Sequence, residues 1–269
     1  MIYIIIGIIV LLILSIIYFY YEDFKVKQTR YELKTDKINN DYKIIQISDF
    51  HNEKNKWLHK QLINIIENEK PNIIVITGDL IDAKDNKYAK KLIEEIKLYA
   101  PIYYAPGNHE YEFGGYEKLR KILADNNINL LENASIKIDN NINIFGIKDP
   151  MFESPRNEIE VVKEKLDNFK IDNKNYNILL SHRPEKFDIY YKYDFDLVFT
   201  GHAHGGQFIL PFIGPVFSPH QGLFPKLARG IHKKNNTTMV VSRGLGNSLY
   251  AIIRINNRPE LNIVSLLKK

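Results

Sequence analysis

The chain opens with an apolar run from Ile2 to Tyr21 that contains no charged residue. A helix of this length spans roughly 30 Å, the thickness of a bilayer core. Tyr18, Tyr20 and Tyr21 stand at one end, where interfacial aromatic residues belong. A signal peptide fits less well, because the run has neither a basic start nor a small-residue cleavage pattern. We therefore predict a transmembrane anchor over residues 1–21, in contact with the bilayer through residues 2–21.

A polar stretch, residues 22–41, follows the apolar run, and we expect it to be a juxtamembrane linker with an edge strand around Arg30–Leu33. From residue 42 onward, short apolar runs alternate with segments of helical periodicity. The pattern predicts helices over Trp57–Asn68, Tyr88–Leu98, Gly115–Asn126 and Glu158–Phe169. It predicts strands over Lys43–Ile47, Ile73–Thr77, Ile102–Ala105, Ile128–Leu131, Ser135–Ile138, Ile142–Ile147, Asn177–Leu180, Leu197–Thr200, Met239–Ser242, Ala251–Ile255 and Leu261–Leu266.

The order of these elements predicts the fold class. Strands alternate with helices first, the three strands between Ile128 and Ile147 are expected to form hairpins, and the end of the chain is rich in strands. This order predicts an α/β fold with a mixed sheet, or a pair of sheets, and helices outside. No internal repeat divides residues 42–269, so we expect them to form one domain.

Composition and charge narrow the chemistry. The chain has no cysteine, so any metal must be held by nitrogen and oxygen ligands, which suit Mn, Fe, Co, Ni or Zn. The net charge is +5, but basic and acidic residues are mixed, and we expect no nucleic-acid binding. The basic residues Lys25, Lys27, Arg30, Lys34 and Lys37 follow the apolar run, and none precedes it. This bias favours a cytoplasmic catalytic domain in a single-pass protein of the cell membrane.

Residues that bind metals or phosphate follow five predicted strands. The segments are Ser48-Asp49-Phe50-His51, Gly78-Asp79-Leu80-Ile81-Asp82, Pro106-Gly107-Asn108-His109-Glu110, Ser181-His182-Arg183-Pro184 and Gly201-His202-Ala203-His204. Ligands of α/β sheets bind at the carboxyl ends of strands, so these segments should converge in space. Any single histidine is more often a structural residue, but five in this context predict a metal site. His59, His220 and His232 lack that context, and we expect no site role for them.

The five segments, in this order, resemble the motifs of the calcineurin-like metallophosphoesterases over about residues 42–269. The forms Ser181-His182-Arg183-Pro184-Glu185, His204-Gly205-Gly206-Gln207 and Val241-Ser242-Arg243-Gly244-Leu245-Gly246 look like a narrower branch. That branch comprises membrane-anchored bacterial phosphodiesterases and hydrolases of UDP-2,3-diacylglucosamine. One motif departs from the protein-phosphatase branch: Ala83-Lys84 stands where that branch has Arg-Gly, so protein phosphatase activity is not expected.

The resemblance implies a four-layer sandwich, in which two packed mixed sheets are flanked by helices, and a site for two divalent cations, Mn²⁺ before Fe, Zn, Co or Ni. Asp49, His51, Asp79 and His204 would hold the first cation, and Asp79, Asn108, His182 and His202 the second. A metal-bridging hydroxide would attack phosphorus in line. His109 would be catalytic, either stabilising the charge that develops or protonating the leaving oxygen. Glu110 is expected to orient ligands rather than to bind metal.

Substrate contacts are expected near the last metal motif. Arg183 either clamps a phosphate or points away from the site. Residues 207–225 contain no Asp, Glu, Lys or Arg, and their prolines exclude a regular helix or a central strand. This apolar loop either covers the core or forms a wall for the apolar part of a substrate, with Gln207, Phe212 and Phe217 as contact residues.

These expectations define a membrane-anchored metal-dependent phosphoesterase. It would hydrolyse a phosphodiester or pyrophosphate bond of a phosphoester substrate, in the leading interpretation a lipid-linked one of the UDP-diacylglucosamine type. Two alternatives stay open at this point. The chain is a hydrolase of soluble nucleotides or phosphodiesters, or it is a non-catalytic metal-binding scaffold at the membrane.

Overall fold

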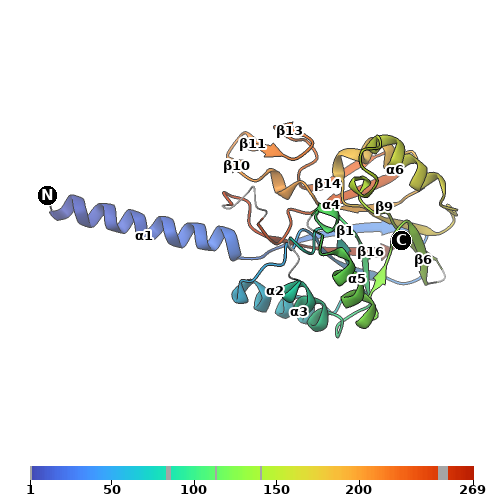
Figure 1. The fold of residues 1–269 in the computed structure, drawn as a ribbon, viewed down its shortest axis with the longest axis horizontal. Coiled ribbons are helices and arrows are strands. Elements are labelled where there is room, and N and C mark those ends of the chain that lie inside the picture. Colours follow the sequence, from blue (N-terminus) through green and yellow to red (C-terminus); the bar gives the residue numbers. More distant parts are fainter. Residues whose placement is uncertain (1, 83–85, 113, 140, 248–253) are drawn as a thin grey trace.

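The computed structural model describes residues 2–82, 86–112, 114–139, 141–247 and 254–269. Two β-sheets pack face to face, helices cover both outer faces, and a long N-terminal helix stands away from this body (Figure 1). The α/β fold predicted from the sequence, with two mixed sheets flanked by helices, is confirmed. The strand predicted over Ala251–Ile255 lies largely outside the described residues.

The first sheet has six strands in the order β1-β16-β2-β3-β4-β5. Strands β2 to β5 are parallel, β16 is antiparallel to β2, and β1 runs parallel to β16. The strands are β1 (Lys27–Thr35), β2 (Tyr42–Ile47), β3 (Ile73–Thr77), β4 (Ile102–Ala105), β5 (Asn129–Leu130) and β16 (Glu260–Lys268). Because Asn262 pairs with Gln46 and Lys27 with Glu260, β1 and β16 begin at the edge where β2 ends.

The second sheet also has six strands, in the order β14-β15-β9-β8-β7-β6. Its four central strands are parallel, and hairpin partners add an antiparallel strand at each edge. The strands are β6 (Ala134–Asp139), β7 (Ile142–Gly146), β8 (Tyr176–Leu180), β9 (Leu197–Thr200), β14 (Gly230–Lys234) and β15 (Thr237–Val241). The central parallel strands β3 and β4 of the first sheet and β8 and β9 of the second are short apolar runs, as expected for strands buried on both faces.

Helices form the two outer layers. The first sheet is covered by α2 (Lys56–Glu69), α3 (Lys87–Ile96) and α5 (Tyr116–Asp125), and the second by α6 (Glu158–Asp167) and α7 (Phe187–Tyr190). Shorter turns complete the connections: α4 (Asn108–Glu112), η1 (Pro150–Glu153), η2 (Pro184–Lys186) and η3 (His204–Gly206). The buried residues Leu58, Leu62 and Ile66 of α2 recur every four positions, which places them on the face toward the sheet.

Between the sheets lies a continuous apolar layer. Val75 and Tyr103 of the first sheet pack there with Ile178, Leu197 and Phe199 of the second. Burying such side chains contributes roughly 1.5–3 kcal/mol each. This layer fixes one sheet against the other, and so it fixes the loops at their carboxyl ends.

Three local expectations differ from the structure. The edge strand expected around Arg30–Leu33 is present as β1, but it begins at Lys27, so much of the expected linker is part of the body. Strand β5 joins β4 of the first sheet and is not a hairpin partner of β6; of the three strands expected to form hairpins, β6 and β7 pair with each other. Strand β14, which was not expected, forms a hairpin with β15.

The apolar loop, residues 207–225, forms two small hairpins. The elements are β10 (Ile209–Leu210), β11 (Gly214–Pro215), β12 (Phe217–Ser218) and β13 (Gly222–Leu223). They lie outside the two main sheets, which agrees with the absence of a regular helix or central strand expected from the prolines. Figure 1 shows them on the side of the body from which the N-terminal helix leaves.

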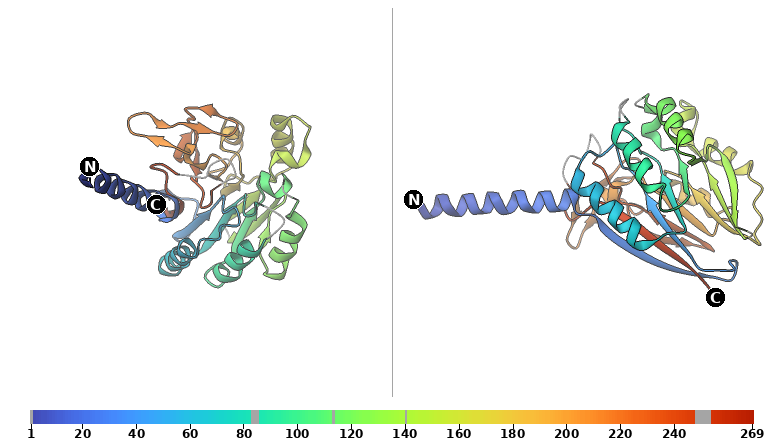
Figure 2. Two further views of the ribbon diagram at one scale, coloured as in Figure 1. Left: turned by 60° about the vertical axis from the view of Figure 1, so that its left-hand side comes forward. Right: turned by 90° about the horizontal axis from the view of Figure 1, so that it is seen from below.

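Helix α1 (Ile2–Phe24) extends away from the body in every view (Figures 1 and 2). It is long and apolar enough to cross a membrane, and none of its apolar window is buried. Its last turn is held by the body: the buried carboxylate of Glu22 accepts the backbone N–H of Asn257 at 2.9 Å. Asn257 in turn donates its side-chain amide to the carbonyl oxygen of His204 at 2.7 Å.

Candidate metal centre

Eight residues singled out from the sequence meet at the carboxyl ends of the parallel strands. Each is at most 6% exposed. They are Asp49 and His51 after β2, Asp79 after β3, Asn108 and His109 after β4, His182 after β8, and His202 and His204 after β9. The two sheets contribute to one site because the apolar layer between them brings their carboxyl ends together.

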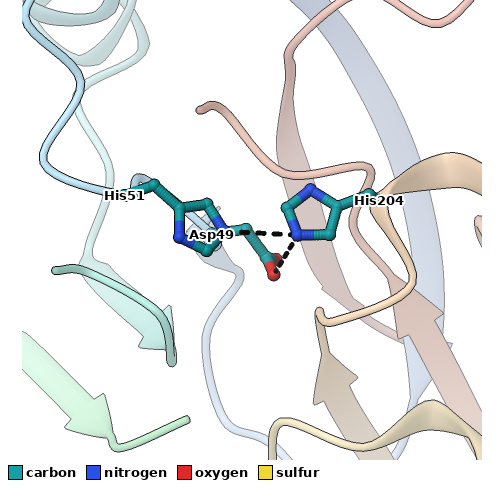
Figure 3. A group of neighbouring side chains, drawn as sticks. All are labelled: Asp49, His51 and His204. Carbon is teal, nitrogen blue, oxygen red and sulfur yellow. Dashed lines mark hydrogen bonds and ion pairs between the residues drawn. The ribbon is translucent and has the colours of Figure 1, made fainter. Parts of the chain in front are cut away.

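The first cluster is formed by Asp49, His51 and His204, whose ligand atoms all lie within 4.8 Å of one another. Figure 3 shows the two imidazoles and the carboxylate turned toward a common point, with 3.2 Å between the Nε2 atoms of His51 and His204. The carboxylate oxygen Oδ1 of Asp49 lies 3.5 Å from Nε2 of His204. Burial lowers the pKa of both histidines below the ordinary value, so both are neutral, as metal ligands must be.

The second cluster is formed by Asp79, His182 and His202, again within 4.8 Å. Nε2 of His182 lies 3.1 Å from a carboxylate oxygen of Asp79 and 3.2 Å from Nδ1 of His202. The other ring nitrogen of His182 lies 2.8 Å from the carbonyl oxygen of Thr77, which orients the ring and leaves Nε2 toward the cluster. Burial lowers the pKa of His182, but Asp79 raises it more, to about 10. The carboxylate thus draws positive charge to this point.

Two further observations fit a bound cation. The side-chain oxygen of Asn108 is buried and has no hydrogen-bond partner in the described part of the chain. An unpartnered buried amide oxygen is costly unless something else, such as a metal, satisfies it. A Cβ built on Gly107 would lie 2.2 Å from Oδ1 of Asp79, so this turn admits only glycine and lets the backbone approach the carboxylate. The donor set of carboxylates, imidazoles and one amide suits divalent transition metals.

Backbone strain is concentrated at these same residues. Asp49, His51, Asp79, His202 and His204 all have φ between 46° and 65°, in the left-handed region that residues with a Cβ avoid. Such conformations cost about 1–3 kcal/mol each and persist where function over-determines them. These turns bring side chains at alternate positions, such as Asp49 with His51 and His202 with His204, into one site.

Glu110 organises the backbone around the site instead of facing it. Its carboxylate accepts N–H bonds from Asp79, Leu80 and Gly107 at 2.7–2.9 Å. These bonds join the turn after β3 to the turn after β4. The expectation that Glu110 orients ligands agrees with this geometry.

His109 faces the second cluster from the start of α4. Its Nε2 lies 3.8 Å from Asp79, and its Nδ1 lies 2.9 Å from a carboxylate oxygen of Asp82. Burial lowers the pKa of His109, but the carboxylates of Asp79 and Asp82 raise it more, to about 9. The ring therefore carries a proton at neutral pH and is able to donate one.

Arg183 does not fit the phosphate clamp considered from the sequence. Its side chain is fully buried, and its Nε and Nη2 atoms pair with the carboxylate of Asp149, the latter at 2.9 Å. Its remaining nitrogen, Nη1, lies 2.9 Å from Nδ1 of His220. Because Asp149 and His220 engage its nitrogens, this guanidinium supports the residues of the site and is not available to bind a substrate phosphate.

His220 is a site residue that the sequence analysis missed. Its Nδ1 lies 2.9 Å from Nε2 of His202, in addition to the contact with Arg183. Nδ1 of His202 faces His182, so the opposite ring nitrogen, Nε2, is the one that meets His220 and, at 3.3 Å, Nη1 of Arg183. The sequence held one signal for it: His220 is the single titratable side chain in residues 207–225.

A cavity of about 340 Å³ opens over the second cluster. It is lined by Asp79, Asn108, His109, Glu112, His202, His204, Gln207, Phe217, Pro219 and His220. Two expected contact residues, Gln207 and Phe217, thus line the cavity. Phe212 does not line it, because it is fully exposed at the end of a hairpin, and its contact with a substrate stays a prediction.

A two-sheet α/β sandwich with paired Asp/His clusters at the carboxyl ends of its strands defines a metallophosphoesterase. The family model of the calcineurin-like phosphoesterases matches residues 42–206. The chain belongs to this family, and so it is a metal-dependent phosphoester hydrolase.

Individual proteins agree with the family. The metallophosphoesterase YkuE of Bacillus subtilis is 28% identical over 263 residues, which cover 92% of this chain and 87% of that protein. A transmembrane protein with metallophosphoesterase domain from Danio rerio is 28% identical over 84% of this chain and 53% of that protein. The crystal structure of TT1561 of Thermus thermophilus has the same fold, with a TM-score of 0.54 at 12% identity, covering 76% of this chain and 90% of that chain.

Proposed function

We propose that this chain is a membrane-anchored, two-metal phosphoesterase that hydrolyses a phosphodiester or pyrophosphate bond of a lipid-linked substrate of the UDP-diacylglucosamine type. Residues 1–21 are the anchor, residues 22–41 connect it and supply β1, and residues 42–269 form the catalytic domain on the cytoplasmic side. The observation that carries the proposal is the pair of buried Asp/His clusters beneath one open cavity.

Each cluster has the ligands for one divalent ion, for which we propose Mn²⁺. Asp49, His51 and His204 hold the first, while Asn108, His182 and His202 hold the second; Asp79 contributes to both. Bound ions of this kind lower the pKa of a water and neutralise charge on the phosphoryl oxygens. His109 stands at the mouth of the cavity as the proton donor to the leaving oxygen.

The proposal of a lipid-linked substrate rests on where α1 meets the body. The last turn of α1 is joined through Asn257 to the carbonyl oxygens of His204 and Gln207, at 2.7 and 3.0 Å. A helix able to cross a membrane is therefore linked through one residue, Asn257, to the loop that carries a predicted metal ligand. The apolar side chains of Phe217 and Pro219 line the cavity beside that loop and suit the apolar part of a substrate.

The test is a substrate panel with the full-length chain in vesicles, after chelation and with Mn²⁺ restored. The panel comprises phosphomonoesters, soluble phosphodiesters, nucleotides and nucleotide-diphospho-lipids, with Asp79→Asn as the inactive control. We expect the lipid-linked diphosphate to have the highest kcat/KM. A higher kcat/KM for soluble nucleotides would contradict the lipid-linked substrate and support a hydrolase of soluble nucleotides. Metal binding without turnover of any substrate would leave only a scaffold.

A further inference from the structure

The two small hairpins of residues 207–225 expose an unusual set of side chains. Phe212, in the turn of the first hairpin, is fully exposed, and Leu223 and Phe224, where the second strand of the other hairpin ends, are 69% and 59% exposed. We call the set formed by Leu210, Phe212, Ile213, Leu223 and Phe224 the apolar tips. No charged residue occurs between Gln207 and Pro225 to make this surface favourable in water. Several large apolar side chains exposed on one short segment without charged residues are typical of an interaction site.

The hairpins are fixed to one another and to the body. The backbone N–H of Phe224 donates to the carbonyl oxygen of Val216 at 2.9 Å, and that of Val216 donates to Phe208 at the same distance. Ile209 donates its N–H to Ile255 at 3.0 Å. The apolar tips are therefore presented by a hydrogen-bonded unit.

A chain of hydrogen bonds fixes the position of this hairpin unit along the axis of α1. The hydroxyl of Tyr18 donates to the side-chain oxygen of Asn256 at 3.2 Å. The amide of Asn256 donates to the carbonyl oxygen of Ile209, in β10, at 3.1 Å. Tyr18 belongs to the aromatic end of the apolar helix, where a spanning helix meets the lipid headgroups. The base of the first hairpin thus lies level with the interface.

We propose that the apolar tips enter the lipid surface that α1 crosses. The partner is the acyl region of the bilayer, since the hairpins lie on the side from which α1 leaves (Figures 1 and 2). The inference rests on the membrane anchoring proposed above and adds a second membrane contact to it. The cavity, which Phe217 of the second hairpin lines, then opens at the level of the headgroups.

The test uses tryptophan as a depth probe in the full chain. Trp57 is the single tryptophan, so a Trp57→Phe background removes the native signal. Phe212→Trp and Phe224→Trp are compared with Leu98→Trp, because Leu98 is 76% exposed and precedes β4 at the opposite end of the sheet. The proteins are reconstituted in phosphatidylcholine–phosphatidylglycerol vesicles with brominated or plain acyl chains.

Side chains that insert by roughly 5–10 Å meet the brominated chains, and we expect at least about a twofold loss of fluorescence at positions 212 and 224, with none at position 98. If each of the three variants fluoresces equally in brominated and in plain vesicles, the proposal is overturned. The apolar tips are then assigned to a protein contact or a substrate lid. Hydrolysis of lipid-linked substrate is measured on the same samples. Quenching without hydrolysis refutes only the proposed function. Hydrolysis without quenching refutes only the insertion of the apolar tips into the bilayer.

Discussion

The carboxylate of Asp82 lies 2.9 Å from Nδ1 of His109. This contact engages one ring nitrogen and leaves the other, Nε2, toward Asp79 and the cavity. A carboxylate behind an imidazole fixes the orientation of the ring and stabilises its protonated form. The pair is thus suited to deliver a proton to a leaving oxygen.

Removing the imidazole should slow the chemical step. His109→Ala is expected to lower kcat by about 10²–10⁴-fold, the usual contribution of a positioned acid, with both metals still bound. Metal content and turnover of a chromogenic phosphodiester are measured together. His232→Ala, on β14, is the matched control and should keep wild-type turnover. Full turnover by His109→Ala with both metals present contradicts the catalytic role.

The pH profile should report the same pair. His109 is protonated below its pKa of about 9, so proton donation is available at neutral pH and is lost as the pH rises through that value. Asp82→Asn removes one of the carboxylates that raise this pKa, so the alkaline decline of kcat should begin at lower pH. An unchanged alkaline limb in Asp82→Asn would assign the decline to another group.

Gly107 should be essential for metal binding. Its added Cβ would collide with the carboxylate of Asp79, so Gly107→Ala is expected to lose metal and activity together. Gly7→Ala is the matched control, because nothing lies within 4 Å of a Cβ at that position of α1. Metal content by elemental analysis and thermal unfolding are compared for both. Wild-type metal content in Gly107→Ala would show that the turn relaxes.

His220 should act through His202. Outer hydrogen-bond partners of metal-binding histidines typically contribute 10- to 100-fold to metal affinity, and His220→Ala is expected to weaken binding of one Mn²⁺ by about that factor. His220→Asn, whose side-chain oxygen is placed near the lost Nδ1, should restore much of the affinity. Calorimetric titration with Mn²⁺ after chelation measures both variants. Two unchanged sites in His220→Ala would limit His220 to lining the cavity.

The sequence predicted most of the residues that meet at the candidate site because these residues follow local rules. A polar segment after a parallel strand must lie at the carboxyl edge of its sheet, and this placed Asp49, Asp79 and His182 without knowledge of the pairing. The apolar runs likewise predicted the central strands. The sequence of a short apolar segment does not show which strand it pairs with, however, and so β5 was assigned to the wrong neighbouring strands.

What escaped prediction depends on contacts that no local pattern encodes. His220 reaches the site because a hairpin folds back over it, and Arg183 lies buried behind His202 and His220 because Asp149, distant in sequence, binds its guanidinium. Phe212 and Phe217 look alike in sequence, yet one ends a hairpin and the other lines the cavity. Tertiary packing alone separates such pairs.

The hydrogen bonds from Glu22 through Asn257 to His204 leave the body little freedom to swing about the end of α1. An enzyme held this way in a bilayer searches a plane and not a volume. Its turnover is then set by the number of substrate molecules per unit area and by their lateral diffusion. Diluting the lipid-linked substrate with inert lipid slows such an enzyme, even when the bulk concentration of substrate is unchanged.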